Sequence, residues 1–407
     1  MNGMNTSLGA HPDRAAEASR TDNTGGRQRK RKLLTISSRA FIDQSYGPTV
    51  HFIELWNEFH KRFSEQWDVT GICFYRDRPD HPAVDIEFQH RSFRASVNRL
   101  SKNVLSDLKT AGWLLFKIQS FDLVYMRTEP FVPLTYLLIR LFKKTLIVEA
   151  NSSMKDDVRA LKVRGLLVRF AAWQERKQVE HAALSIAVSS GIAKYLKTLK
   201  AKKIVTITNG VASKYFDLPQ KAAGDGPIKI VYVGTYAQWS GVIHIVELAQ
   251  KFPEVEFYIY GEGQFKAEVE RAIRSENVHL VGYVEYKDLP NVYQKYDASI
   301  VLYTMKRNEI VLSSIKTMEY MACGLPIFAT DVPGQEYIGE HRIGVLTDLE
   351  NIERNFRSFI RDLDTYRRNV ESFRHSQGQK YRWSETARLT GDAINSVTDA
   401  VNADALT

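Results

Sequence analysis

A short stretch of this chain carries side chains suited to an anionic, hydroxyl-rich ligand. Residues 313–326 read SSIKTMEYMACGLP. Ser313 or Ser314 can cap the start of a helix, where free N–H groups and the positive end of the helix dipole suit a diphosphate. Lys316 adds a positive charge in the first turn, and Glu319, one turn later, offers a carboxylate to paired sugar hydroxyls. We therefore expect this stretch to bind a nucleotide-sugar; the ordinary alternative is a surface helix with a Lys–Glu pair.

Three other patterns have a structural explanation rather than a cofactor-binding or metal-binding one. Gly261 and Gly263 begin a dinucleotide-binding spacing, but Lys266 stands where the third glycine is required, which argues against a dehydrogenase. Asp362 and Asp364 form a D-x-D pair of the kind that binds metals, yet they fall in an amphipathic helical pattern, where a solvated face is expected. The histidines are scattered and form no pair at metal-ligand spacing. The sequence therefore predicts no metal site.

The charge of the chain is unevenly distributed. The formal net charge is +9, with 34 Lys and Arg against 20 Asp and Glu in residues 1–210, and 22 against 27 in residues 211–407. A basic half can meet nucleic acid, an anionic membrane surface or a phosphate-bearing substrate. Nucleic acid is the weakest of the three, because the chain has neither zinc-ligand spacing nor the strand signature of an RNA-binding sheet. We expect no nucleic acid among the partners.

Cysteine usage and the apolar runs indicate a compartment. Cys73 and Cys323 lie far apart within apolar segments, which argues against a disulfide framework and favours a reducing cytoplasm. No run approaches the roughly 20 apolar residues of a membrane span, and the N-terminus is polar where a secretory signal is apolar. Residues 131–142 contain Pro133 and Arg140; we interpret them first as a buried helix and second as a helix that can rest on a membrane. We expect a cytoplasmic protein, able to lie peripherally at the inner face of the membrane.

The length of the chain predicts two domains, because 407 residues exceed what one core usually supports. Residues 1–31 hold almost no large apolar side chains and are expected to form a disordered basic tail. After this tail, strand and helix patterns alternate in two runs, as in doubly wound parallel α/β domains. The predicted boundaries are 32–217 for the first domain, 218–227 for a polar linker, 228–382 for the second domain and 383–399 for a C-terminal helix.

Five motifs occur in order along the second half. They are ITNGV at 207–211, IVYVG at 230–234, IYGEG at 259–263, VHLVGYV at 278–284 and EYMACGLP at 319–326. With these motifs, the chain resembles the GT-B glycosyltransferases, specifically the large retaining family numbered four. Each motif alone is weak, but five in order at matching spacing are specific.

The resemblance implies a fold and a donor site. The fold would be GT-B, in which two Rossmann-like domains face each other across a cleft, and residues 383–399 would cross back to the first, acceptor-binding domain. Glu319 would bind the ribose hydroxyls, and Lys316 would hold the diphosphate with Ser313 and Ser314. The other donor-binding residues implied are Gly47, whose loop closes over the sugar-phosphate, Gly234 and Thr235 at a close backbone approach, Ser240, Gly261 and Gly263 in the donor loops, and Gly282 and Tyr283 beside the base.

The resemblance also implies a catalytic set. Arg127 occupies the place of a frequent histidine, and Glu149 with Asn151 looks like the E-x-N variant found near the transferred sugar. Lys316 completes the set. Since no residue is offered as a protein nucleophile, the implied reaction is a front-side transfer in which the leaving phosphate assists deprotonation of the acceptor. No cofactor and no obligatory metal are expected.

Three positions depart from the family pattern. The paired-acid motif would put its first glutamate at Val311, and Thr235 and Ser240 stand where an arginine and a lysine are usual. Related subgroups with S-P-x-K-x-x-E-Y-M here also lack the first glutamate. The leading hypothesis is a retaining, hexosyltransferase-like enzyme that moves a sugar to a saccharide acceptor, lipid-linked or anionic, in bacterial-type polysaccharide or glycoconjugate biosynthesis. The departures motivate an alternative from another class, a non-catalytic GT-B subunit that binds a nucleotide-sugar or serves as a scaffold in a polysaccharide-assembly complex.

Overall fold

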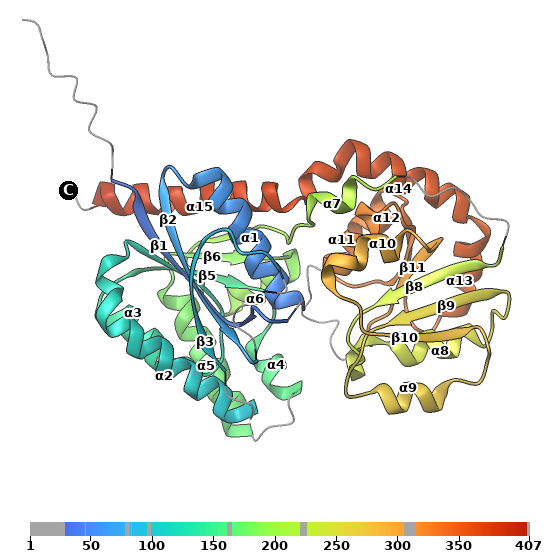
Figure 1. The fold of residues 1–407 in the computed structure, drawn as a ribbon, viewed down its shortest axis with the longest axis horizontal. Coiled ribbons are helices and arrows are strands. Elements are labelled where there is room, and N and C mark those ends of the chain that lie inside the picture. The colour runs from blue at the N-terminus through green and yellow to red at the C-terminus, as the bar shows by residue number, and fades with distance from the viewer. Residues whose placement is uncertain are drawn as a thin grey trace, which may run out of the picture. The chain divides into compact units, whose positions relative to one another are not determined.

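The computed structural model describes residues 29–44, 46–77, 82, 84–95, 99–160, 165–219, 226–304 and 315–404. From residue 31 onward the chain forms one compact unit built on two parallel sheets, each flanked by helices (Figure 1). The predicted fold class, α/β with two doubly wound sheets, is confirmed. Most of the predicted tail, most of the predicted linker and residues 305–314 lie outside the described residues.

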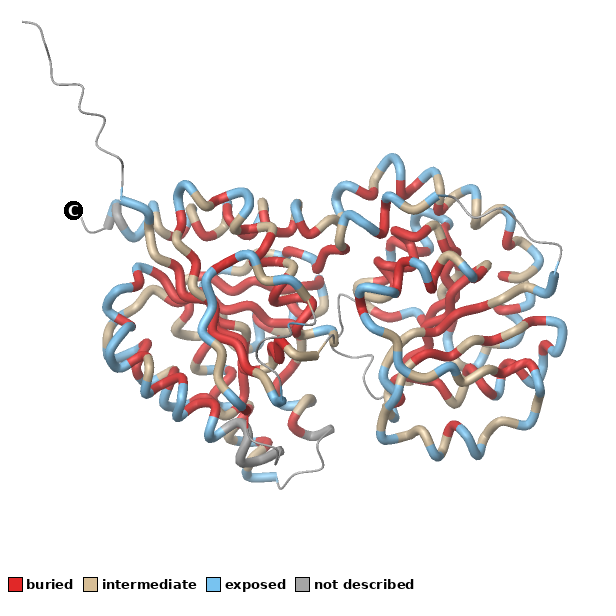
Figure 2. Tube along the Cα trace, viewed as in Figure 1, coloured by how far each residue is buried: buried red, intermediate tan, exposed pale blue. Residues whose placement is uncertain are grey.

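The first sheet has the strand order β3-β2-β1-β4-β5-β6-β7, and its neighbouring strands pair in parallel. Its central strands are buried on both faces, as expected for a sheet covered by helices on both sides (Figure 2). The strands are β1 (Arg31–Phe41), β2 (Trp67–Tyr75), β3 (Gln89–Arg94), β4 (Leu123–Arg127), β5 (Thr145–Ala150), β6 (Leu184–Ala187) and β7 (Ile204–Thr206); the helices are α1 (Gly47–Phe63), α2 (Arg99–Lys117), α3 (Pro133–Leu141), α4 (Met154–Ala160), α5 (Gly165–His181), α6 (Ser190–Thr198) and α7 (Ser213–Phe216).

The second sheet has the order β10-β9-β8-β11-β12-β13 and is also parallel. Its apolar side chains form their own buried clusters with the surrounding helices. The strands are β8 (Ile228–Val233), β9 (Val255–Tyr260), β10 (Val278–Gly282), β11 (Ala298–Val301), β12 (Ile327–Thr330) and β13 (Gly344–Thr347); the helices are α8 (Val242–Ala249), α9 (Lys266–Ala272), α10 (Leu289–Tyr293), α11 (Ile315–Ala322), α12 (Glu336–Glu340), α13 (Ile352–Arg361), α14 (Leu363–Gln377) and α15 (Trp383–Asp404).

Several elements differ from the sequence-based expectation. β3 and α2 were not expected. β3 is a largely exposed edge strand without an apolar pattern, whereas the apolar residues of α2 recur at helical spacing and could have predicted the helix. The helical pattern expected around Asp362 and Asp364 forms two helices, α13 and α14, that meet at Asp362. Asp362 binds Arg361 at 3.0 Å while Leu363 is buried, so this D-x-D pair belongs to a helix junction.

The strand order places the reversal point of each sheet. In the first sheet β1 pairs with both β2 and β4, and in the second β8 pairs with both β9 and β11. In doubly wound folds, ligands bind beyond the carboxyl ends of the strands at this reversal. The segments after β1 and β4, and after β8 and β11, are therefore where a site is expected.

The C-terminal helix α15 packs on the first sheet's α1. Ala387, Ile394 and Val397 share an apolar cluster with Trp56 and Phe63 of α1. Trp67 at the start of β2 also donates to the Asn395 side chain at 3.0 Å. The C-terminal helix α15 therefore stabilises the N-terminal domain.

Candidate active site

The backbone at the end of β8 passes close to a lysine. Gly234 directly follows β8, and its N–H donates to the carbonyl oxygen of Tyr260 at 3.0 Å. A Cβ atom at Gly234 would lie 2.4 Å from Lys316 Nζ and 2.7 Å from the hydroxyl of Tyr232. The Lys316 ammonium group lies 4.6 Å from the centre of the Tyr232 ring. A glycine at 234 therefore lets the lysine of α11 approach the backbone at the end of β8.

Glu319 lies one turn after Lys316 on α11 and is only 4% exposed. Tyr293 donates a hydrogen bond to its Oε2 at 3.1 Å. Burial raises the pKa of Glu319 to about 7, although the Tyr293 bond and the charges of Lys316 and Lys214 act in the opposite direction. A buried carboxyl group that titrates near neutral pH is a marker of a functional site.

Further glycines gather at the same strand ends. Gly261 has a φ of 128°, a backbone angle that residues with a side chain rarely adopt. A Cβ atom there would lie 1.9 Å from the carbonyl oxygen of Gly234. Its N–H donates to the carbonyl oxygen of Gly282 at 2.8 Å. At Gly263, a Cβ atom would lie 2.2 Å from the carbonyl oxygen of Tyr236. Gly234, Gly261, Gly263 and Gly282 are thus brought together by β8, β9 and β10, where they let the backbone segments pack closely against one another.

In the first domain, Glu149 is the centre of a buried polar cluster. His51 Nε2 of α1 lies 2.8 Å from its Oε1, and both Tyr125 and Asn151 donate hydrogen bonds to the carboxylate. Burial would raise the pKa of Glu149, but His51 and Arg127 outweigh it and hold the pKa at about 2. Glu149 is therefore a permanent carboxylate that fixes the orientation of Asn151.

Arg127, the last residue of β4, lies opposite Glu149 in the strand register. Burial is the main cause of a lowered pKa at Arg127, and the charge of Glu149 opposes it. Among the described residues, its Nη1 is buried without a hydrogen-bond partner. Arg127, Glu149, His51 and Tyr125 line a common cavity. The cavity has a volume of about 10 Å³, which leaves room for one water molecule at most, and it lies between β1, β4, β5 and α1.

Two family models match consecutive parts of the chain. Residues 47–214 match the model described as Glycosyltransferase Family 4, and residues 227–363 match the one described as Glycosyl transferases group 1. The chain belongs to the family 4/group 1 glycosyltransferases. No curated protein matches it by sequence.

Solved structures show the same GT-B fold over nearly the whole glycosyltransferase. Sucrose-phosphate synthase from Thermosynechococcus elongatus is 17% identical, with a TM-score of 0.73 over 91% of this chain and 100% of that chain. HepE of Anabaena, solved with UDP-glucose, is 16% identical, with a TM-score of 0.66 over 90% and 99%. A mutant of S. aureus TarM, solved with fondaparinux, α-GlcNAc-glycerol and UDP, is 10% identical, with a TM-score of 0.62 over 88% and 98%. At these identities the similarity shows the fold.

The remaining predicted donor residues of this glycosyltransferase have different environments. Ser240 is buried, and its hydroxyl donates to the carbonyl oxygen of Ala237 at 2.7 Å while accepting from the Ala237 N–H at 3.1 Å, so its bonds go to its own loop. Thr235 is exposed directly after Gly234. Gly47 starts α1 in open space, and Tyr283 is 62% exposed after β10. Ser313 and Ser314, together with Val311, lie outside the described residues.

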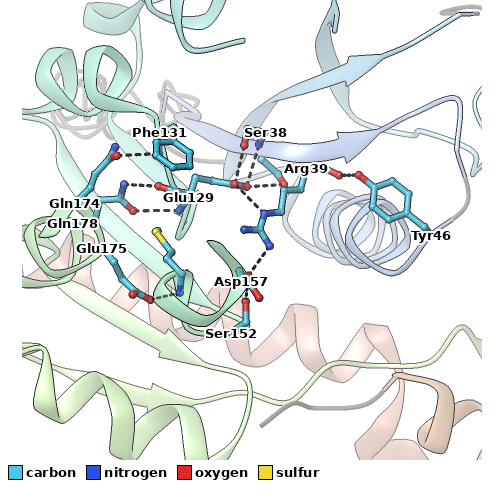
Figure 3. A network of polar contacts seen from close by, with 12 residues as sticks. Ser38, Arg39, Tyr46, Glu129, Phe131, Ser152, Asp157, Gln174, Glu175 and Gln178 are labelled. Carbon is cyan, nitrogen blue, oxygen red and sulfur yellow. Dashed lines mark hydrogen bonds and ion pairs between the residues drawn. The ribbon is translucent and has the colours of Figure 1, made fainter. Parts of the chain in front are cut away.

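The sequence analysis missed a polar network at the carboxyl ends of β1 and β4 (Figure 3). Ser38 donates to Glu129 through its N–H at 3.1 Å and its hydroxyl at 2.7 Å. Arg39 lies 3.5 Å from Glu129 and 2.7 Å from Asp157 of α4, and Tyr46 donates to the Arg39 carbonyl oxygen. Burial raises the pKa of Glu129, against the effects of Arg39 and Arg127. The only hint in the sequence is position: Ser38 and Arg39 lie near the end of an apolar strand and Glu129 just after another, in a doubly wound pattern.

The described residues contain neither a candidate metal-binding cluster nor a candidate membrane-spanning helix. Among the described residues, no three or more His, Cys, Asp and Glu side chains are grouped so that they could hold a metal ion. Within the same residues, no helix is long and apolar enough to cross a membrane.

Proposed function

We propose that the chain is a retaining, hexosyltransferase-like enzyme that transfers a sugar from a nucleotide-sugar to a saccharide acceptor. The observation that carries the proposal is the juxtaposition of Lys316, buried Glu319 and Gly234 at the end of β8. The arrangement offers a cation and an acceptor for hydroxyl groups within one short region. These are the groups that a sugar linked to a nucleoside diphosphate requires.

In this proposal, Lys316 and Glu319 bind different parts of the donor. The ammonium of Lys316 holds a diphosphate oxygen, and the carboxylate of Glu319 accepts hydrogen bonds from two ribose hydroxyls. Donor binding then favours the ionised carboxylate and lowers the pKa of Glu319 from about 7. Ser313 and Ser314 complete the diphosphate site, Gly261 and Gly263 give it close backbone approach, and Gly282 and Tyr283 lie beside the base.

The transfer itself needs no protein nucleophile. The bond between the sugar's anomeric carbon and the β-phosphate oxygen breaks, and a bond from that carbon to the acceptor oxygen forms on the same face. The acceptor's hydroxyl proton passes to the departing phosphate, and a nucleoside diphosphate leaves. Lys316 stabilises the charge that develops on this phosphate, which lowers the barrier. The positive charge of Lys316 supports a reaction without an obligatory metal or cofactor.

On the first domain, Arg127 and Asn151 face the transferred sugar in this proposal. Arg127 Nη1 is a buried donor without a partner among the described residues, and Asn151 is held by Glu149. Glu149 is unsuited to be a base or nucleophile, because its pKa is about 2 and several groups already bind it. We therefore assign Glu149 as a positioning residue, with Arg127 and Asn151 binding sugar hydroxyls or the departing phosphate.

The neighbours support a saccharide acceptor. TarM was solved with UDP and α-GlcNAc-glycerol, and HepE with UDP-glucose, according to their descriptions. We propose, for this chain, a lipid-linked saccharide acceptor in polysaccharide or glycoconjugate biosynthesis on the cytoplasmic side of a membrane. The basic charge of residues 1–210 supports an acceptor that carries a phosphate.

The experiment is a transfer assay followed by NMR of the product's anomeric centre. Purified protein is incubated with UDP-, GDP- and ADP-hexoses and a membrane lipid extract, with and without EDTA. The proposal expects a product whose anomeric configuration equals the donor's, formed equally in EDTA. An inverted product would contradict retention, and loss of activity in EDTA would contradict metal independence.

The non-catalytic alternative rests on one observation, the internal bonding of Ser240 where the family usually has a lysine. It expects nucleotide-sugar binding without turnover. Glu319→Gln separates the two ideas, since an enzyme loses turnover whereas a scaffold keeps its role in assembly.

A further inference from the structure

Exposed large apolar side chains concentrate on α2 and α3 among the described residues. Phe116 is 86% exposed and Leu141 65% exposed. Isolated exposed leucines are normal, but a continuous set on adjacent helices marks an interaction surface. We call this surface the α2–α3 apolar face, and it comprises Leu108, Leu115 and Phe116 of α2 with Leu134, Leu137 and Leu141 of α3.

The two helices form one firmly packed unit. Asp107 of α2 is buried and accepts the N–H groups of Leu134 at 2.8 Å and Thr135 at 2.9 Å, which caps the start of α3. Ala111 and Leu114 on the inner side of α2 belong to the core of the first domain. Figure 1 shows α2 and α3 side by side, and Figure 2 shows buried and exposed residues alternating along them. The apolar face is therefore a fixed outer surface of the domain.

The charges on this surface have one sign. Asp107 is the only acidic residue in the sequences of α2 and α3, and it is buried against the start of α3. Lys117, Arg140 and Lys143 are exposed on or next to the two helices. The two helices themselves expose apolar side chains and cations but no carboxylate, and the acidic residues of neighbouring elements, Asp122 and Glu180, lie near the cations of Lys144, Arg176 and Lys177. This combination fits a partner that is apolar inside and anionic at its surface.

We propose that the α2–α3 apolar face docks onto an anionic lipid bilayer. The leucines and Phe116 enter the boundary between headgroups and acyl chains, and Lys117, Arg140 and Lys143 contact lipid phosphates. A second copy of this chain fits less well, because pairing the face with itself would bring cations together without carboxylates. The proposal goes beyond the transferase reaction, since it requires neither donor binding nor turnover.

The test is cosedimentation of the full chain with vesicles of phosphatidylcholine, with and without about one third phosphatidylglycerol. We expect binding to the anionic vesicles that weakens when salt rises from about 0.1 M to about 0.5 M. The double variant Leu108→Ser with Phe116→Ser should lower the partition coefficient roughly tenfold or more. The triple variant Lys117→Gln, Arg140→Gln and Lys143→Gln should lower it by about fivefold per charge, on the order of a hundredfold together.

The matched control is Leu389→Ser with Val401→Ser, which removes exposed apolar side chains of α15. It should bind vesicles like the wild type, and every variant should keep the wild-type melting temperature and nucleotide-sugar binding. The proposal is overturned if the wild type ignores anionic vesicles or if the Leu108/Phe116 variant binds them as well as the wild type does. A wild-type dimer that this variant converts to monomers, without vesicle binding, would assign the face to a second copy and also overturn it.

Discussion

At the scale of single residues, Glu319 and Glu149 show how environment assigns opposite properties to one side-chain type. Both are buried, but Glu149 has His51, Arg127 and Tyr125 around it and a pKa of about 2. Glu319 has tyrosine partners and more distant lysines, and burial raises its pKa to about 7. The carboxylate of Glu149 already has its hydrogen-bond and charge partners. The carboxylate of Glu319 has fewer, and the hydroxyl groups of a ligand can supply further hydrogen bonds to it.

The raised pKa of Glu319 predicts a pH-dependent stability. Between about pH 4.5 and 7 the folded protein binds this proton while the unfolded chain has lost it, so stability falls as pH rises through that range. The loss attributable to this group is about 3 kcal/mol at pH 8. Glu319→Gln should therefore be more stable than the wild type at pH 8 and nearly equal to it at pH 5, as measured by urea unfolding without ligand. An equal difference at both pH values would contradict the raised pKa, and the exposed Glu285→Gln serves as control.

The His51–Glu149 contact predicts a large loss on deletion. His51→Leu leaves Glu149 buried with fewer partners, which should lower the free energy of unfolding by about 3–5 kcal/mol. The exposed pair His244–Glu247 is the matched control, and His244→Leu should change the free energy of unfolding by less than about 1 kcal/mol. Denaturant unfolding at neutral pH measures both, and equal effects would refute the assigned role of His51.

At the scale of elements, the sequence predicted the two alternating runs and the glycine motifs because apolar strands and glycine turns are local signals. The edge strand β3 was missed because it lacks an apolar pattern. The helix α2 could have been predicted from the helical spacing of its apolar residues, although the exposure of several of them follows from tertiary packing. His51 and Arg39 were missed for a related reason. Their partners, Glu149 and Asp157, are about a hundred residues away in sequence, and only the sheet order brings them together.

The strand-end glycines predict separable effects on folding and binding. In Gly234→Ala the new Cβ meets the flexible end of Lys316 and the hydroxyl end of the buried Tyr232 but no backbone, so folding should weaken by only about 1–2 kcal/mol while nucleotide-sugar affinity falls about tenfold or more. In Gly261→Ala the new Cβ meets the backbone at an unfavourable φ, so folding itself should weaken by more than about 3 kcal/mol.

Gly47→Ala, where the Cβ meets open space, is the control for folding. Melting temperatures and donor titrations distinguish the variants. If Gly234→Ala bound the donor with unchanged affinity, the proposed close approach of the Gly234 backbone to the donor would be contradicted.

At the scale of the whole molecule, the end of the chain stabilises its beginning. Trp383 at the start of α15 is 1% exposed and meets the His51 ring edge-on at 5.2 Å. Trp383→Ala should lower the free energy of unfolding by about 3–5 kcal/mol, whereas Trp173→Ala, at a half-exposed tryptophan, should lower it by about 1 kcal/mol or less. Thermal unfolding of the two variants measures this, and similar melting temperatures would contradict a structural role for α15.

The most direct test of the account is calorimetric titration of the purified chain with UDP-, GDP- and ADP-sugars. We predict that one nucleotide class binds, that Glu319→Gln weakens this binding by about 10- to 100-fold, and that Lys316→Met does so comparably. The exposed Lys287→Met should leave the affinity unchanged. Failure of the folded wild type to bind any nucleotide-sugar, or wild-type affinity in both Glu319→Gln and Lys316→Met, would contradict the donor site and the transferase function proposed from it.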